Sequence, residues 1–289
     1  MTKLIFSDPH IDEKSIPELD SVFAEICEDF PADELIMCGD YYEKKQPTTR
    51  EVLFGTKWAK QFKQRYEKVI FLRGNHDKTE DISAIDYLQY LGITIVNDYT
   101  DECNNYFGHF MVVGSRLEYG TAKCSLTDLK TKARIILGHQ HSFQTLADNA
   151  YHLGSIRYVN FNEAKDTDKF IAKIDDKNEI HFIPLSSPMP MYDVNSIEDL
   201  STIETGMVKV RLIINSFNQF KREIDIISKI KHKYNVFKIK LNFEKSTNPI
   251  EAKKIDVKIK KLDEVLREGI DKIKDKDVKK LLKEVIDEE

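Results

Sequence analysis

The chain has 289 residues, more than a typical single domain, so we expect one large domain with something smaller attached. Hydrophobic residues make up 41% of it and charged residues 32%, and the formal net charge of -5 excludes binding to nucleic acid through overall charge alone. The sequence has no apolar run of about 18 residues, no long apolar stretch in its first residues and no C-x-x-C pair, so we expect a cytoplasmic protein with reduced thiols and no membrane span.

Short apolar runs alternate with amphipathic stretches in the first half of the chain, a pattern typical of an α/β sheet. We expect strands at residues 4–6, 35–38, 69–72, 93–96 and 135–137, with more strands between 151 and 174. Helices are expected at about 16–30 and 50–66, and a shorter one around 82–90. A Pro/Ser-rich stretch at 184–190 cannot continue a helix or a central strand, so we end the first domain at residue 185.

Two smaller segments are predicted beyond this boundary. Strands at 208–214 and 236–241 enclose a helix with apolar residues at helical spacing, which predicts a βαβ unit. Further on, apolar residues recur at three- and four-residue steps and indicate two short amphipathic helices. The predicted organisation is therefore a domain at 1–185, a small cap-like unit at 186–248, and a linker with a helical pair at 249–289.

Groups that bind divalent cations follow four of the predicted strands. They are Asp8-Pro9-His10, Gly39-Asp40, Gly74-Asn75-His76-Asp77 and Gly138-His139-Gln140-His141. The carboxyl ends of strands in an open α/β sheet form the ligand crevice, so we expect these side chains to lie together. Taken singly, each has an ordinary interpretation, because an Asp at a strand end often caps a helix, a lone His is often structural and an Asn suits a turn. Their occurrence in this order behind strands predicts a site for hard divalent cations.

This order of motifs resembles the calcineurin-like metallophosphoesterase superfamily, in which D-x-H, G-D, G-N-H-D, a lone His and G-H-x-H build a dinuclear metal site. The resemblance implies an α/β (α+β) fold, a four-layer β-sandwich flanked by helices. It also implies that one ion is held by Asp8, His10, Asp40 and His141, and the second by Asp40, Asn75, His109 and His139. We expect the two divalent ions to be Mn²⁺, and the same ligands accept Fe or Zn²⁺.

The resemblance also assigns roles beside the ligands. His76 is implied to be catalytic, either stabilising the transition state or protonating the leaving 3′ oxygen, with Asp77 as a candidate to orient it. Glu43 stands where many members of the superfamily have an Asp, so its role stays open. For His109 the alternative is a surface histidine on a hairpin, and His152 is interpreted as structural.

The later part of the chain resembles a narrower group. The stretch from Gln144 to Ile174 resembles the SbcD-like double-strand-break repair nucleases, the βαβ unit resembles their DNA-binding cap, and the helical pair is similar to the segment that binds an SbcC-type coiled-coil ATPase. The resemblance implies a Mn²⁺-dependent DNA exonuclease and endonuclease acting in DNA end processing, repair and recombination. The partners it implies are DNA, the ATPase and a second copy of the chain.

Local charge supports a DNA-binding surface. Between Met207 and Leu262 there are fifteen Lys and Arg against five Asp and Glu, an excess typical of phosphate-backbone binding. The DNA-binding candidates are Lys209, Arg211, Lys221, Arg222, Lys238 and Lys240. The alternative is a solvated, lysine-rich surface. In the helical pair, the residues expected to contact the ATPase are Leu262, Leu266, Ile270, Leu281, Leu282 and Val285.

Two other functions are compatible with the motifs. One is a phosphatase or small-molecule phosphodiesterase whose basic unit binds a different anionic substrate, and cleavage of a small ester without cleavage of DNA would favour it. The other is a non-catalytic scaffold for DNA ends. The presence of all seven ligand types argues against a scaffold.

Overall fold

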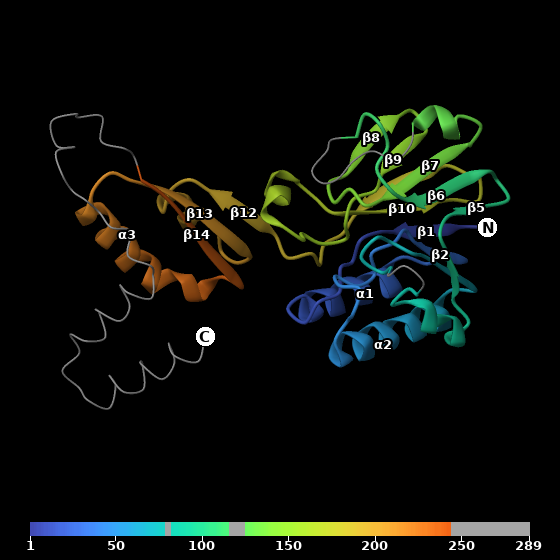
Figure 1. The fold of residues 1–289 in the computed structure, drawn as a ribbon, viewed down its shortest axis with the longest axis horizontal. Coiled ribbons are helices and arrows are strands. Elements are labelled where there is room, and N and C mark those ends of the chain that lie inside the picture. The colour runs from blue at the N-terminus through green and yellow to red at the C-terminus, as the bar shows by residue number, and fades with distance from the viewer. Residues whose placement is uncertain (79–81, 116–124, 244–289) are drawn as a thin grey trace. The chain divides into compact units, whose positions relative to one another are not determined.

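A six-stranded and a five-stranded sheet are built from the chain up to residue 184 (Figure 1). The computed structural model describes residues 1–78, 82–115 and 125–243. In the order in which they lie side by side, the strands of the six-stranded sheet are β11 (Ile180–Pro184), β10 (Phe170–Ile174), β1 (Lys3–Phe6), β2 (Glu34–Met37), β3 (Lys68–Leu72) and β4 (Thr94–Val96). Those of the five-stranded sheet are β5 (Tyr99–Thr100), β6 (Asn105–His109), β7 (Arg134–Gly138), β9 (Ala150–His152) and β8 (Gln144–Ala147).

Parallel strands lie at the centre of both sheets. In the larger sheet β1, β2, β3 and β4 are parallel neighbours, while β10 and β11 run antiparallel at the other side. In the smaller sheet β6, β7 and β9 are parallel, with β5 and β8 antiparallel at the edges. Because parallel strands end at the same edge, the residues that follow β1, β2 and β3 are brought together, as are the last residue of β6 and those that follow β7.

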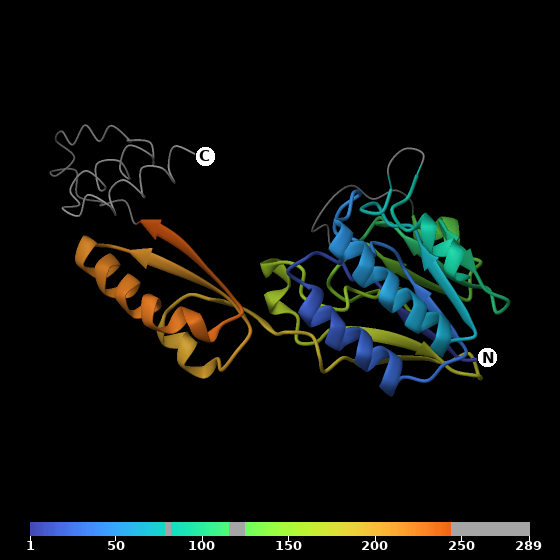
Figure 2. The same ribbon diagram turned by 90° about the horizontal axis from the view of Figure 1, so that it is seen from below.

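Two helices cover one face of the larger sheet, and the smaller sheet covers the other. Helices α1 (Ile16–Asp29) and α2 (Thr49–Arg65) lie along the same face in Figure 2. Helix α2 begins with a capping box, in which Thr48 and Glu51 satisfy each other's backbone N–H groups. Leu4 and Phe6 pack towards the helices, whereas Ile5 packs against the smaller sheet. Burial on both faces explains why the predicted strands read as continuous apolar runs.

The outer face of the smaller sheet carries a short 3₁₀ helix, η2 (Leu126–Leu129), which completes a thin fourth layer. The helix expected around residues 82–90 is instead the 3₁₀ helix η1 (Asp86–Leu91), which ends at Gly92 in a left-handed conformation. The other described 3₁₀ helices are η3 (Phe161–Lys165), η4 (Glu198–Thr202) and η5 (Lys231–Lys233). The predicted mixed α/β fold is confirmed.

A third sheet follows the proline-rich stretch, with strands β12 (Met191–Val194), β13 (Met207–Ile214) and β14 (Val236–Phe243) in that order. Helix α3 (Phe217–Ile230) packs on one face of this sheet, where the even-numbered residues of β13 are buried. On the opposite face, Met191 and Met207 pack against Tyr158 and Phe161. Strand β12 was not predicted, so the unit is a βαβ with one additional parallel strand.

Residues 1–242 form one compact unit, and the predicted domain boundary at residue 185 stays a prediction. The predicted helical pair, with its candidate contacts from Leu262 to Val285, lies outside the described residues. Within the described ranges, no helix combines the length and the apolar character that a bilayer crossing requires.

Candidate metal centre

The backbone at the strand ends adopts a conformation that L-amino acids rarely take. Asp8, His10, Asp40 and His139 have positive φ angles of 52°, 47°, 53° and 81°. Across the described residues only Asn104 and Asn178 share this property among non-glycines. A left-handed conformation costs roughly 1–2 kcal/mol per residue, so it persists only where surrounding contacts impose it. All four strained residues belong to the predicted ligand set.

Arg157 supplies part of that constraint. Its guanidinium is buried and donates from Nε to the Pro9 carbonyl at 3.0 Å and from Nη2 to the His10 carbonyl at 3.0 Å. The backbone N–H of His10 donates in turn to the Asp40 carbonyl at 3.1 Å. Sequence reasoning gave Arg157 no role, and the only signal was an arginine between the apolar residues Ile156 and Tyr158.

Glycine before two of these residues allows close approach of a side chain. A Cβ at Gly39 or at Gly138 would overlap the imidazole of His109. With both positions open, the side chain of His109, at the end of β6, reaches the residue that follows β2 in the larger sheet. There its Nδ1–H donates to the Cys38 carbonyl at 2.6 Å. This bond leaves Nε2 of His109 free to act as a ligand.

The first group of candidate ligands is Asp8, His10 and His141, whose ligand atoms all lie within 4.8 Å of one another. His10 Nε2 is 3.7 Å from an oxygen of Asp8 and 3.7 Å from an oxygen of Asp40. Both ring nitrogens of His10 are buried without a well-formed hydrogen bond, although Nδ1 lies 2.8 Å from Glu43 Oε2. Such buried nitrogens fit a site that a cation completes.

The second group is Asp40, His109 and His139, again within 4.8 Å. Asn75 joins it, because its Oδ1 is 3.1 Å from His109 Nε2 and 2.6 Å from His139 Nδ1. Asp40 Oδ2 lies 3.2 Å from His109 Nε2 and 3.7 Å from His10 Nε2. Asp40 therefore stands between the two groups, the position expected of a bridging carboxylate. The structure brings all seven predicted ligands together, and their binding of metal stays a prediction.

His76 is held beside both groups without belonging to either. Its backbone N–H donates to Asp40 Oδ1 at 2.8 Å, and its Nδ1–H donates to the Glu43 carbonyl at 2.6 Å. The side chain of Glu43 forms a third cluster with His10 and His76. Glu43 thus orients two imidazoles, a role that the sequence left open.

Asp77, which was a candidate to orient His76, contacts backbone groups of the neighbouring loops. Its buried oxygens accept the backbone N–H groups of Tyr41, Tyr42 and Gly74, and so fix the loop around Asp40. Burial, with the negative charge of Asp40 nearby, raises the pKa of Asp77 to about 6.

Glu163 is a functional candidate that sequence reasoning missed. It is fully buried, and its Oε1 accepts a hydrogen bond from His141 Nδ1 at 3.1 Å while its Oε2 pairs with Lys169 at 2.6 Å. Burial opposes ionisation, but His141 and Lys169 outweigh it and lower the pKa of Glu163 to about 2. Glu163 also caps η3 together with Asn160. The N-x-x-E spacing of a capping box was the available signal.

The electrostatics of the centre favour positive charge. Burial opposes protonation of His10, yet the nearby carboxylates of Asp8 and Glu43 raise its pKa to about 10. Burial likewise opposes protonation of His109, and the carboxylates of Asp40 and Asp8 raise its pKa to about 9. The pKa of Asp40 is held below its usual range, despite burial, chiefly by His109. This donor set of carboxylates, imidazoles and one amide oxygen therefore fits two divalent cations.

The sequence model of the calcineurin-like phosphoesterase family matches residues 1–227, well over half of the chain. The chain belongs to the calcineurin-like phosphoesterase family. These proteins are metal-dependent hydrolases that act on phosphoester bonds, so the chain is an enzyme of that class.

No curated protein matches this phosphoesterase in sequence. The solved structures that match include the crystal structure of Pseudomonas putida nuclease MPE, with 20% sequence identity and a TM-score of 0.30. The match covers 52% of this chain and 66% of the length of that one.

The DNA-binding candidates of this phosphoesterase lie on two different faces of the third sheet. Side chains alternate along a strand, so Lys209, Arg211, Lys238 and Lys240 share the face opposite α3. Lys221 and Arg222 are exposed on α3 itself. The six residues therefore do not share one face of the sheet, and their binding to DNA stays a prediction.

Part of the positive charge is paired. Arg211 donates from Nε to Asp193 Oδ1 at 2.7 Å and from Nη2 to Asp193 Oδ2, and Lys209 Nζ lies 3.3 Å from Asp193 Oδ2. These hydrogen bonds lower the pKa of Asp193, with the contribution of Arg211 the largest. On the other face, Arg222 pairs with Glu223 at 3.1 Å.

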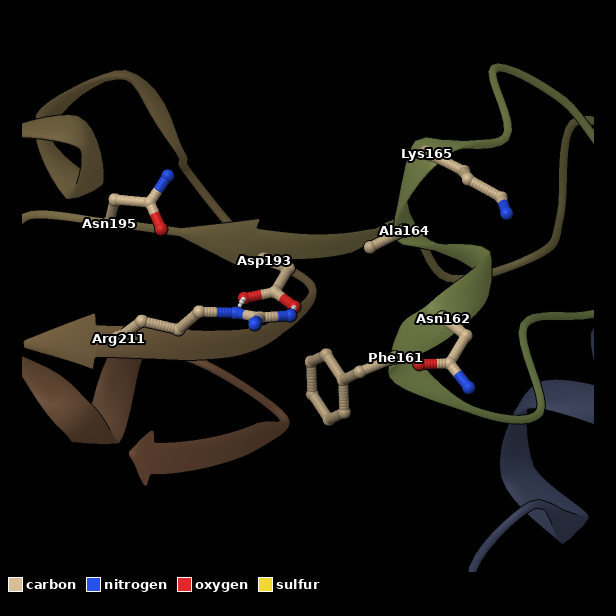
Figure 3. A pocket seen from close by; sticks show the side chains of 7 residues that line it. All are labelled: Phe161, Asn162, Ala164, Lys165, Asp193, Asn195 and Arg211. Atoms are coloured by element: carbon tan, nitrogen blue, oxygen red, sulfur yellow. Dashed lines mark hydrogen bonds and ion pairs between the residues drawn. The ribbon is translucent and has the colours of Figure 1, made fainter. Parts of the chain in front are cut away.

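A pocket of about 500 Å³ lies between η3 and this sheet of the phosphoesterase (Figure 3). Phe161 projects into it from η3, and the Arg211–Asp193 pair faces it from the strands. The remaining side chains that line the pocket are Asn162, Ala164, Lys165 and Asn195.

Proposed function

We propose that the chain is a Mn²⁺-dependent DNA nuclease, with exonuclease and endonuclease activity, that processes DNA ends in double-strand-break repair and recombination. The observation that carries this proposal is the position of Asp40 between two groups of candidate ligands, with a lysine- and arginine-bearing sheet face in the same unit. A hydrolytic centre beside cations suited to phosphate backbones supports a polymeric phosphodiester as the substrate.

Asp8, His10, Asp40 and His141 would hold one ion, and Asp40, Asn75, His109 and His139 the other. When bound, the two ions supply a nucleophile at neutral pH and neutralise charge that develops on the phosphate. The protein presents the imidazoles to the ions in one tautomer. The Cys38 carbonyl does so for His109 and the Glu163 carboxylate for His141, because each accepts the Nδ1–H and leaves Nε2 with its lone pair.

His76 supplies the proton step in this proposal. Its Nδ1–H is bonded to the Glu43 carbonyl, so Nε2 is the atom that exchanges a proton with the leaving 3′ oxygen or stabilises charge on the phosphate. The contact of its backbone with Asp40 fixes its position relative to the ligands. His76 therefore acts on the substrate without being a ligand itself.

The proposed partners are DNA, an SbcC-type ATPase and a second copy of this chain. ATPase binding is assigned to Leu262, Leu266, Ile270, Leu281, Leu282 and Val285, as implied by the resemblance. Truncation at residue 260 should leave Mn²⁺-dependent hydrolysis intact and abolish co-purification with the ATPase. A truncated protein that still co-purifies with the ATPase would contradict this assignment.

The decisive experiment is digestion of single- and double-stranded DNA by the purified protein, with Mn²⁺ and with EDTA. We expect cleavage only with Mn²⁺. Parallel assays on bis(4-nitrophenyl) phosphate and on a phosphomonoester separate the alternatives. Hydrolysis of a small ester without cleavage of DNA would favour the phosphatase or small-molecule phosphodiesterase, and no hydrolysis of any substrate would favour the scaffold.

A further inference from the structure

The pocket between η3 and the third sheet has the size and the chemistry of a nucleotide site. Its volume of about 500 Å³ is within the usual range for pockets that bind small organic groups. The ring of Phe161 forms one wall and the Arg211–Asp193 pair another (Figure 3). Asn162 and Asn195 also belong to the lining of the pocket.

Positive charge surrounds the aromatic wall. The ammonium groups of Lys238 and Lys209 lie 5.0 Å and 5.7 Å from the centroid of the Phe161 ring. With Arg211 they place three cations near the one carboxylate of Asp193, and Lys165 is a fourth cation in the lining of the pocket. An anionic ligand with a flat aromatic part is complementary to such a site.

We propose that this pocket binds one nucleotide of a single-stranded nucleic-acid segment, with its base on Phe161 and its flanking phosphates on Lys209 and Lys238. This inference rests on the proposed nuclease function and deepens it. A base that stacks on the ring displaces the two ammonium groups, and charge-assisted hydrogen bonds to phosphate are stronger than exposed cation–π contacts. Stacking of this kind tolerates any base, as a nuclease without sequence preference requires.

The pocket is connected to the candidate metal centre by η3, which carries residues of both. Phe161 directly follows Asn160, whose Nδ2 lies 2.7 Å from Glu163 Oε1 and 3.4 Å from His141 Nδ1. Asn160 and Glu163 cap η3, which carries Phe161, and Glu163 also contacts the candidate ligand His141. A strand held at Phe161 is anchored to the same short helix that supports His141.

The test is binding of a single-stranded oligonucleotide of about ten nucleotides, containing 2-aminopurine, to the full-length protein in EDTA. Phe161→Leu keeps an apolar side chain and removes the ring, so affinity should fall about tenfold and the quenching of 2-aminopurine by stacking should be lost. Phe161→Trp should bind like the wild type. Lys238→Gln should weaken binding about threefold, whereas Lys229→Gln, which removes an exposed charge on α3, should not.

Free nucleoside monophosphate, used as a competitor, separates a strand from a small ligand. We expect it to compete only at concentrations far above those of the oligonucleotide. Unchanged affinity of Phe161→Leu and Lys238→Gln would overturn the subsite, while DNA cleavage by the wild type with Mn²⁺ would leave the proposed function standing. Tight, Phe161-dependent binding of the monophosphate alone would overturn the strand as ligand. A wild-type protein that neither binds nor cleaves DNA would overturn both proposals.

Discussion

The metal centre and the outer face of the third sheet both gather charged side chains, but they hold them differently. In the centre, Asp8, His10 and Asp40 are buried, and backbone hydrogen bonds between the loops fix their positions. On the sheet face, Lys209 and Arg211 are partly exposed and share Asp193. Buried charged groups must therefore be held in one fixed geometry. Exposed cations act instead through their summed charge, and pairing with a carboxylate reduces that sum.

The largest expected effect is that of Asp40→Ala, because this carboxylate lies between both candidate ligand groups. We expect activity on every substrate to fall to background and calorimetry to show loss of two-ion binding. Asp176→Ala, on an exposed turn, is the matched control and should behave like the wild type. An Asp40→Ala protein that still binds two ions and cleaves would show that Asp40 is not shared by the two ligand groups. The centre would then depend on a single side chain no more than the sheet face does.

His76→Asn should affect turnover without affecting metal. Loss of a general acid or a transition-state donor lowers rate by about 10²–10⁴-fold, while the ligands themselves remain. Single-turnover rates and Mn²⁺ titration measure the two quantities separately. His232→Asn, at an exposed position of η5, should change neither. A parallel loss of metal and activity would make His76 a ligand.

Glu163→Gln should have an intermediate effect, because it weakens the orientation of His141 without removing a ligand. Loss of such a supporting contact typically lowers metal affinity or activity by about 10–100-fold. Mn²⁺ titration of the variant, compared with Glu28→Gln at an exposed position of α1, measures it. If Glu163→Gln lowers thermal stability but leaves metal affinity unchanged, Glu163 acts only in packing.

The smallest effect, and one of opposite sign, is expected for Asp193→Asn. This substitution releases Arg211 and Lys209 from their shared carboxylate, so DNA affinity should rise a few-fold and depend more steeply on salt. Equilibrium binding at several salt concentrations measures both changes. Weaker binding would show that Asp193 positions these cations for DNA instead of reducing their charge.

The proximity of the candidate ligands could be predicted from the sequence, because residues that follow successive parallel strands appear in the chain as polar motifs behind apolar runs. Asp8, Asp40, Asn75 and His139 each follow an apolar run, and parallel pairing brings those ends together. His109 was found by its place in the order of motifs. Short or polar strands such as β5 and β8 were missed, because two to four residues at a sheet edge carry little periodicity.

Contacts that depend on folding could not be predicted. Arg157 binds carbonyl groups about 150 residues away in the chain, at Pro9 and His10, and a carbonyl has no signature in sequence. The pairing of Asp193 with Arg211 and Lys209 depends on the register between β12 and β13, which sets Asp193 opposite Lys209. A count of charges along the chain contains neither kind of information.

The carboxylate of Glu163 serves η3 and His141 at once, and this sharing has a thermodynamic consequence. A ligand that holds η3 in place favours the orientation of His141 suited to metal, and a bound ion favours the capped form of η3. Coupling free energies between two sites are reciprocal, so each ligand changes the affinity for the other by the same factor. Substrate and metal would therefore bind with positive cooperativity through a single buried side chain.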